Sequence, residues 1–266
     1  MDSSTELIRS RTNPRYRRFL QVKQRGSADL CLLEGPKLVE EAVLAGLPLV
    51  EAAVAPQARS GDRLRRHLTT LAERGVPVHS MDASLVASLS EAETTQGVVA
   101  LARRPTFEED RLFDGVPLVV VAVGIQDPGN LGGLLRTAEA AGATGAYLTE
   151  GTADPFSWKA LRGSMGSAFR LPSLRGHAAK DVVARLRRRQ VAIVGTAADG
   201  ALAYTGADWR RPVALLFGNE GAGLPPDLLR QSDSVVSIPL HGRVESLNVG
   251  VAAGLLLFEA ARQRAQ

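Results

Sequence analysis

Cysteine and histidine are scarce in this chain of 266 residues, which has one cysteine, Cys31, and four histidines. One thiol can form neither an intrachain disulfide nor a cysteine metal cluster, which favours a reducing, cytoplasmic environment. The histidines are scattered without the spacing of ligand pairs, so we expect no metal site. The sequence therefore argues against the disulfide-stabilised and zinc-binding classes of protein.

Long apolar runs are also missing. The two longest, residues 116–125 and 249–258, fall well short of the roughly 20 residues that a membrane helix needs. The first 19 residues carry charges where a signal peptide has its apolar centre, so we expect no export. With 45% hydrophobic residues, the chain can supply the cores of one large or two ordinary globular domains.

Charge is unevenly distributed along the chain. The net charge is only +4, but the first 25 residues hold seven basic side chains against two acidic ones. Arginine forks suit phosphate oxygens, so this segment favours a nucleic-acid partner; an ordinary solvated helix face is the alternative. The candidate RNA-binding residues here are Arg9, Arg11, Arg15, Arg17 and Arg18.

Strands alternate with helices along the chain, which predicts an α/β fold with two domains. We expect a small, mostly parallel α/β domain over residues 1–104, a charged linker over 105–116 and a second α/β domain over 117–266. In the first domain the pattern predicts strands at 31–34, 49–54, 77–80 and 97–101, and helices at 35–45, 62–74 and 82–89.

The second domain begins with an apolar strand, residues 118–123, whose lack of alternation indicates burial on both faces. Further strands are expected at 145–149, 191–196, 213–217 and 235–238, and helices at 131–141, 158–162, 178–189 and 246–262, with a short turn after Pro226. Three polar blocks directly adjoin these elements, which is where α/β proteins place ligand sites.

The first block runs from Asn130 to Arg136, and Asn130 stands immediately before a predicted helix. Asn130 is a natural N-cap for that helix, because its side chain can bond a free backbone N–H of the first turn. Arg136 lies on the second turn of the same predicted helix and is flanked by Leu134 and Leu135. An arginine in such apolar company needs a partner or a ligand.

The second block, GNEGAG at residues 218–223, follows an apolar strand. Its glycines allow close approach of a ligand to the backbone, although a turn would use them as readily. The order of the glycines is not that of a dinucleotide fold, and no phosphate loop occurs in the chain. Generic nucleotide binding is therefore weakly supported.

The third block joins IPL at residues 238–240 to ESLN at 245–248 and then to an apolar helix. Ser246 can cap that helix, whereas Asn248 in a first turn is less readily explained by helix propensity.

Together the three blocks resemble the SpoU/TrmH family of S-adenosylmethionine-dependent RNA ribose 2′-O-methyltransferases, which belongs to the knotted SPOUT superfamily. The matching motifs are N-x-G-x-x-x-R-T-A at 130–138, F-G-N-E-G-x-G-L at 217–224, and I-P-L followed by S-L-N at 246–248. The segment RGSMG at 162–166 is similar to a further family segment. Residues 34–37 and 95–97 are similar to the ribosomal-protein-like substrate-binding domain that many members carry.

The resemblance implies an α/β trefoil knot near residues 218–248, a homodimer with the site at its interface, and S-adenosylmethionine as the cofactor. By the family's motif positions, the cofactor would be held by Thr196, Gly218, Ile238 and Leu247. The reacting hydroxyl would be surrounded by Asn130, Arg136, Glu220, Ser246 and Asn248, and Arg162 would add to the RNA-binding residues. The additional N-terminal domain favours ribosomal RNA over transfer RNA as substrate.

Arg136 is the family's candidate for activating the hydroxyl, but a guanidinium stays protonated and is a poor base. We expect Arg136 to bind a substrate phosphate and to stabilise developing alkoxide charge, while the proton leaves through phosphate, water or Glu220. Glu220 is equally well explained as a structural acceptor of backbone N–H groups. The alternative functions are a non-catalytic RNA-binding assembly factor and a base-directed SPOUT methyltransferase. Gly250 stands where many relatives have serine.

Overall fold

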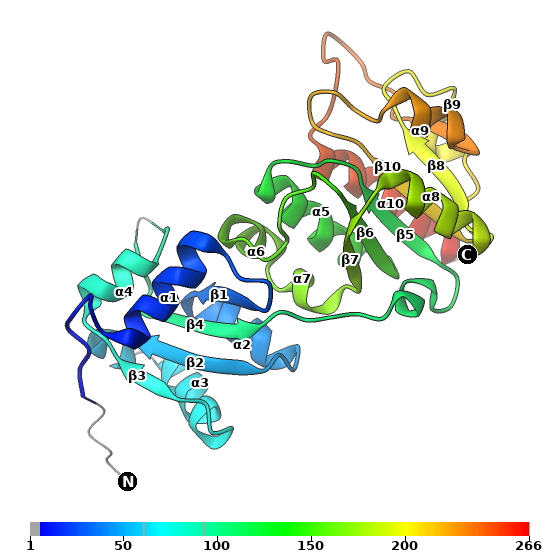
Figure 1. Cartoon of the computed structure of the whole chain (residues 1–266). Coiled ribbons are helices and arrows are strands. Elements are labelled where there is room, and N and C mark those ends of the chain that lie inside the picture. The colour runs from blue at the N-terminus through cyan, green and yellow to red at the C-terminus, as the bar shows by residue number, and fades with distance from the viewer. Residues whose placement is uncertain (1–5, 61, 93, 266) are drawn as a thin grey trace. The chain divides into compact units, whose positions relative to one another are not determined.

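The computed structural model describes residues 6–60, 62–92 and 94–265. Their internal contacts divide the chain into two compact units, which Figure 1 shows: Met1–Pro105 with Phe156–Arg162, and Thr106–Pro155 with Gly163–Gln266. The domain boundaries expected at residues 104 and 117 stay a prediction. Among the described residues, every helix is too short or too polar to span a bilayer.

The N-terminal unit is built on a four-stranded sheet in the order β1-β4-β2-β3. Strand β4 runs antiparallel to both of its neighbours, and only β2 and β3 are parallel. The expectation of a mostly parallel sheet here was wrong, because an apolar strand that is buried on both faces suits either direction. The elements are β1 (Leu30–Glu34), α2 (Gly35–Leu44), β2 (Leu49–Val54), η1 (Pro56–Ser60), α3 (Asp62–Glu73), β3 (Val78–Ser80), α4 (Ala83–Leu89) and β4 (Val98–Arg103).

The basic segment forms a helix, α1 (Pro14–Arg25), that the sequence pattern did not delimit. Asn13 caps it, its Oδ1 atom accepting the N–H of Arg15 at 2.9 Å, and proline occupies the first helical position. Tyr16 and Phe19 are buried in the core, and the arginines between them are exposed. The segment is therefore a packed amphipathic helix that presents a basic face.

The C-terminal unit is built on a seven-stranded sheet in the order β7-β6-β5-β10-β8-β11-β9, and all its strand pairs are parallel. Every residue of the adjacent strands β5 (Leu118–Ala122) and β10 (Val213–Phe217) is buried. This confirms that the apolar runs without alternation mark strands covered on both faces. The mostly parallel α/β architecture expected for this domain is confirmed.

Helices and short strands complete the chain. Strands β7 and β9 were not expected, because the first is interrupted by polar residues and the second has only two residues. The remaining elements are α5 (Pro128–Ala140), β6 (Gly145–Thr149), α6 (Trp158–Ser164), α7 (Ser167–Arg170), β7 (Ser173–His177), α8 (Ala179–Arg188), β8 (Ala192–Thr196), β9 (Leu202–Ala203), η3 (Tyr204–Gly206), α9 (Pro226–Gln231), β11 (Ser234–Ser237) and α10 (Val249–Arg264).

The segment expected as a linker folds in part onto the C-terminal unit. A 3₁₀ helix, η2 (Glu109–Phe113), places Leu112 at 0% exposure in the core of that unit. Glu109 accepts a hydrogen bond from the hydroxyl of Tyr147 at 2.6 Å and pairs with Arg185 at 2.9 Å. Glu109, one of the acidic residues of this segment, thus attaches the segment to the C-terminal unit, which composition alone did not reveal.

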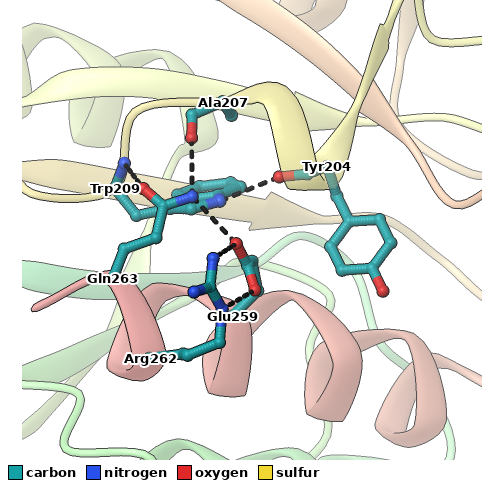
Figure 2. A network of polar contacts seen from close by, with 6 residues as sticks. All are labelled: Tyr204, Ala207, Trp209, Glu259, Arg262 and Gln263. Carbon is teal, nitrogen blue, oxygen red and sulfur yellow. Dashed lines mark hydrogen bonds and ion pairs between the residues drawn. The ribbon is translucent and has the colours of Figure 1, made fainter. Parts of the chain in front are cut away.

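The end of α10 is fixed by a buried polar network, shown in Figure 2. Gln263 is 6% exposed; its Oε1 accepts the N–H of Trp209 at 3.1 Å, and its Nε2 donates to the carbonyl oxygen of Ala207 and to Glu259. Trp209 Nε1 donates to the carbonyl oxygen of Tyr204 at 2.9 Å. The network ties α10 to the loop before β10, and so fixes the helix whose other end reaches the site.

Candidate functional site

The carboxyl ends of β5, β10, β8 and β11 share one edge of the parallel sheet, the edge at which α/β proteins bind ligands. A cavity of about 540 Å³ lies at the ends of three of these strands. Eight of the nine predicted catalytic and cofactor residues line it: Asn130, Thr196, Gly218, Glu220, Ile238, Ser246, Leu247 and Asn248. The fold therefore brings the three sequence blocks to one place.

Three side chains, one from each block, are joined by hydrogen bonds at this cavity. Asn248 Nδ2 donates to Asn130 Oδ1 at 2.9 Å, and Asn130 Nδ2 donates to Glu220 Oε1 at 3.1 Å. A carboxylate only accepts hydrogen bonds, so the amide NH₂ of Asn130 faces Glu220 and its oxygen faces Asn248. We refer to Asn248, Asn130 and Glu220 as the amide chain.

The helix caps at the site differ from those expected. Asp127, not Asn130, caps α5, since its Oδ1 accepts the N–H of Asn130 at 2.8 Å. Asn248, not Ser246, caps α10, accepting the N–H of Gly250 at 2.9 Å. The Asn130 side chain is thereby available to the amide chain, and the same Asn248 side chain serves both the helix and the cavity wall.

The glycine-rich loop is held by a residue that sequence reasoning missed, Asn219. Its Oδ1 accepts the N–H groups of Gly221 and Ala222 at 2.9 and 3.1 Å, and its Nδ2 donates to the carbonyl oxygen of Gly124 at 2.9 Å. The signal was present, because asparagine followed by glycine favours a turn closed by the asparagine side chain. Asn219 thus links the loop to the chain just after β5.

Gly218 begins the loop where two backbone segments nearly touch. A Cβ atom at this position would lie 2.2 Å from the carbonyl carbon of Gly223 and 2.3 Å from the backbone nitrogen of Leu224. Only glycine fits there without movement of the backbone. The narrow loop leaves its backbone groups on the cavity wall, as expected for a residue that holds a ligand through its main chain.

The carboxylate of Glu220 is occupied by backbone donors as well as by Asn130. Its oxygens accept the N–H groups of Gln126 at 3.3 Å and of Asp127 at 3.2 Å. Burial raises the pKa of the Glu220 carboxyl, but the hydrogen bonds from Asn130 and the backbone outweigh it and hold that pKa below its usual value. Glu220 is therefore ionised at neutral pH, and its oxygens bind loop and helix together.

The cavity combines apolar side chains with a single formal charge. Phe217, Val236 and Leu256 are each 1% exposed and line its inner part. Among the described residues that line the cavity, Glu220 is the one ionisable side chain; lysine, arginine and histidine do not occur. A phosphate-bearing cofactor would meet no cation here, whereas a cationic sulfonium compound with an apolar body fits this wall.

Arg136 is the predicted residue that the cavity of this chain does not include. It is exposed on α5, whereas its neighbours Leu134 and Leu135 are at 0% exposure. The apolar sequence around Arg136 marks the opposite, buried face of the helix, so the expectation that those neighbours require a partner for it was wrong.

The predicted RNA-binding arginines belong to the N-terminal unit. Arg9, Arg11, Arg15, Arg17 and Arg18 are all exposed, on α1 or just before it. Arg162 is exposed on α6, and its guanidinium lies 5.3 Å from the ring centroid of Trp158. Their role in RNA binding stays a prediction.

Comparison with known proteins decides the family. Residues 117–258, more than half of the chain, match the SpoU rRNA Methylase family. The chain belongs to this family. Residues 15–100 match the MRM3-like substrate binding domain. The assignment made from the three blocks is confirmed, and with it the expectation of an S-adenosylmethionine-dependent methyltransferase.

Relatives cover nearly the whole chain. The 23S rRNA (guanosine(2553)-2′-O)-methyltransferase RlmP of Bacillus subtilis is 34% identical over 243 residues, which are 91% of this chain and 93% of that protein. The SpoU methyltransferase AviRb from Streptomyces viridochromogenes, solved in complex with the cofactor AdoMet, matches with a TM-score of 0.85 at 31% identity, covering 96% of this chain and 99% of that one. An AdoMet-bound rRNA methyltransferase from Sinorhizobium meliloti gives a TM-score of 0.83 at 33% identity, with 97% of both chains covered.

Proposed function

We propose that this protein transfers the methyl group of S-adenosylmethionine to a ribose 2′-hydroxyl of ribosomal RNA. The observation that carries the proposal is the amide chain, in which Asn248, Asn130 and Glu220 meet at one cavity from three distant parts of the sequence. Ribosomal RNA is favoured over transfer RNA by the relatives' names and by the matched substrate-binding domain.

The cofactor would lie against the apolar part of the cavity. Backbone groups at Thr196, Gly218, Ile238 and Leu247 would hold it. At Thr196 the backbone is the available group, because the side-chain hydroxyl already donates to the carbonyl oxygen of Leu216 at 2.8 Å. When bound, S-adenosylmethionine supplies an electrophilic methyl group on a positively charged sulfur. The ionised Glu220 is the one charged side chain at this wall and favours that positive charge.

The neutral polar residues of the site would position the ribose. Asn130 and Asn248 hold each other's amides at a fixed orientation, and Ser246 is exposed at the cavity mouth. Fixing a hydroxyl in line with its reaction partner accounts for much of the catalysis of a transfer reaction. Glu220 acts first as a structural acceptor, since its lowered pKa makes it a weak base. We expect the proton of the hydroxyl to leave through water or a substrate phosphate.

We further propose a homodimer in which the partner's Arg136 completes the site. The support is an exposed apolar stripe on α10, where Val251, Leu255 and Phe258 are 54%, 40% and 53% exposed at helical spacing. Helix α5, which carries Arg136, packs beside α10. A guanidinium supplied from a second subunit would bind substrate phosphate and stabilise developing negative charge without entering the cofactor cavity.

The trefoil knot and the cytoplasmic location are part of the same proposal. The segment that follows β11 brings Asn248 into hydrogen-bond contact with Asn130, 118 residues earlier in the sequence. Threading of residues 218–248 through a loop of the chain is consistent with this contact. Cys31, the one cysteine of the chain, is buried in the N-terminal unit, and a chain with a single thiol suits a reducing compartment.

Replacement of Arg136 tests the proposal. We expect Arg136→Ala to abolish methyl transfer while S-adenosylmethionine still binds; Arg210→Ala, which removes an exposed arginine before β10 at the other edge of the sheet, should retain both properties. The assay incubates ribosomal RNA with labelled S-adenosylmethionine and analyses the nucleosides by mass spectrometry. Near-normal turnover of Arg136→Ala refutes the role of Arg136. A label on a base, or no label with wild-type protein, refutes the proposed function in favour of one of its two alternatives.

A further inference from the structure

A glutamate and a histidine side chain are buried in the N-terminal unit, at sequence positions distant from the residues of the methyltransferase cavity. Glu51, on β2, is 5% exposed and His79, on β3, is 4% exposed. Burial of an ionised carboxylate is costly unless it is paired. Both side chains therefore need partners, and the partners come from the basic helix α1.

The four side chains form a continuous chain of contacts. His79 Nε2 lies 3.1 Å from Glu51 Oε2, and Arg18 Nη1 lies 2.9 Å from Glu51 Oε1, in an ion pair that is not aligned as a hydrogen bond. Arg15 Nη1 contacts His79 Nδ1. We refer to Arg15, His79, Glu51 and Arg18 as the arginine clamp.

The chemistry of the clamp fixes the state of the histidine. Glu51 only accepts, so His79 Nε2 must carry the hydrogen; Arg15 only donates, so His79 Nδ1 must be the acceptor. This is one tautomer of neutral imidazole. Burial lowers the pKa of His79 and the positive charge of Arg15 lowers it further, against the opposing effect of Glu51. Arg15, Glu51 and, through Glu51, Arg18 are the charges that contact this imidazole.

The clamp restrains two side chains that remain accessible. Arg15 and Arg18 are three residues apart on α1 and share one face of the helix. Both are exposed, and half of the Arg18 side chain is accessible to solvent. Two guanidinium groups share one carboxylate and a neutral imidazole, so the face keeps a net positive charge. An unrestrained arginine loses rotamer entropy when it is fixed on a ligand. The contacts of the clamp already restrain Arg15 and Arg18, so less entropy is lost when they bind.

We propose that Glu51 and His79 are positioning residues, which hold Arg15 and Arg18 as a preformed binding site for two backbone phosphates of the RNA substrate. The inference rests on the proposed function, because it takes RNA as the substrate. The proposal gives the buried Glu51 and His79 a role in RNA binding. It also predicts that Arg15 and Arg18 differ from Arg17, which lies on the same helix outside the clamp, in how their side chains are held.

The test measures RNA affinity of the full-length protein against salt concentration, with in vitro transcribed 23S rRNA as the probe. Loss of one phosphate contact reduces the magnitude of the salt-dependence slope by about 0.7 to 0.9 and weakens binding at physiological salt by about four- to fivefold. We expect both His79→Phe and Arg15→Ala to show this loss. The double variant His79→Phe/Arg15→Ala should bind RNA no more weakly than Arg15→Ala alone. The effects of His79→Phe and Arg17→Ala on RNA affinity should instead be additive.

A second variant guards against misfolding of the first. Glu51→Gln keeps the size and an acceptor for His79, and it should be non-additive with Arg18→Ala in the same measurement. S-adenosylmethionine binding of each preparation reports whether the C-terminal unit is intact. If the wild-type protein methylates and binds the RNA while His79→Phe and Glu51→Gln keep its affinity and slope, the clamp has no role in binding. If the wild-type protein binds and methylates no RNA, the proposed function itself fails.

Discussion

Gly218→Ala should weaken cofactor binding more than any comparable change in the same loop. The added Cβ would lie 2.2 Å from the carbonyl carbon of Gly223, and real Cβ atoms essentially never come within 3.0 Å of another heavy atom, so the backbone must shift. Overpacking of this kind costs about 1–3 kcal/mol. Because the strain is relieved only by opening the loop that lines the cavity, we expect about 5- to 150-fold weaker binding of S-adenosylmethionine.

The matched control is Gly221→Ala in the same loop. Its Cβ would meet Asn219 Oδ1 at 3.6 Å, an ordinary van der Waals contact, and Gly221 also lines the cavity. Isothermal titration of both variants with S-adenosylmethionine, with thermal unfolding measured in parallel, separates a local effect on the loop from global destabilisation. If Gly218→Ala binds the cofactor as tightly as Gly221→Ala does, the close backbone approach does not shape the binding site.

Two further predictions concern the network at the end of α10. Gln263→Leu leaves the buried N–H of Trp209 and the carbonyl oxygen of Ala207 without their partner. The free energy of unfolding, measured with urea, should therefore fall by about 2–4 kcal/mol. The control Gln231→Leu, at an exposed helix end, should change it by less than about 1 kcal/mol. Hydrogen bonds from Arg262 and Gln263 lower the pKa of Glu259 to about 2, whereas the pKa of an unperturbed glutamate is about 4.3. The ionised Glu259 therefore stabilises the folded state fully above about pH 4.3, and this stabilisation is lost as the pH falls to about 2. The unfolding free energies of wild-type protein and Glu259→Gln should accordingly converge as pH falls from 5 to about 2; a constant difference would contradict this origin of stability.

The sequence predicted the location of the site because its three blocks each adjoin a strand or helix of an α/β domain. In a parallel sheet, the carboxyl ends of the strands share one edge, so Phe217 and Thr196 bring their following loops together. Which side chain of a block serves which purpose was less predictable. Asp127 and Asn130 both suit an N-cap, and only the three-dimensional path of the chain shows that Asp127 caps α5 while Asn130 meets Asn248.

The parts of the fold that the sequence did not predict depend on long-range pairing. The direction of β4 is not encoded in its apolar run, because burial on both faces suits an antiparallel centre strand equally well. The anchoring of η2 depends on Leu112 finding a place beside Tyr147, which lies on β6. A charged stretch with one leucine reads as a linker until its neighbours are known.

The charges of the cavity bring the cofactor and the exposed arginine into one argument. Glu220, the one charged side chain on the wall formed by the described residues, suits a cationic methyl donor, and an arginine inside the same wall would oppose that donor. The anionic substrate needs a cation, however, and Arg136 is exposed outside the cavity of its own chain. In the homodimer that we propose, a second subunit would bring this guanidinium to the substrate from a separate surface, and each charge would meet its own ligand. The proposed separation would explain why Arg136, a residue of the sequence motif, does not line the cavity of its own chain.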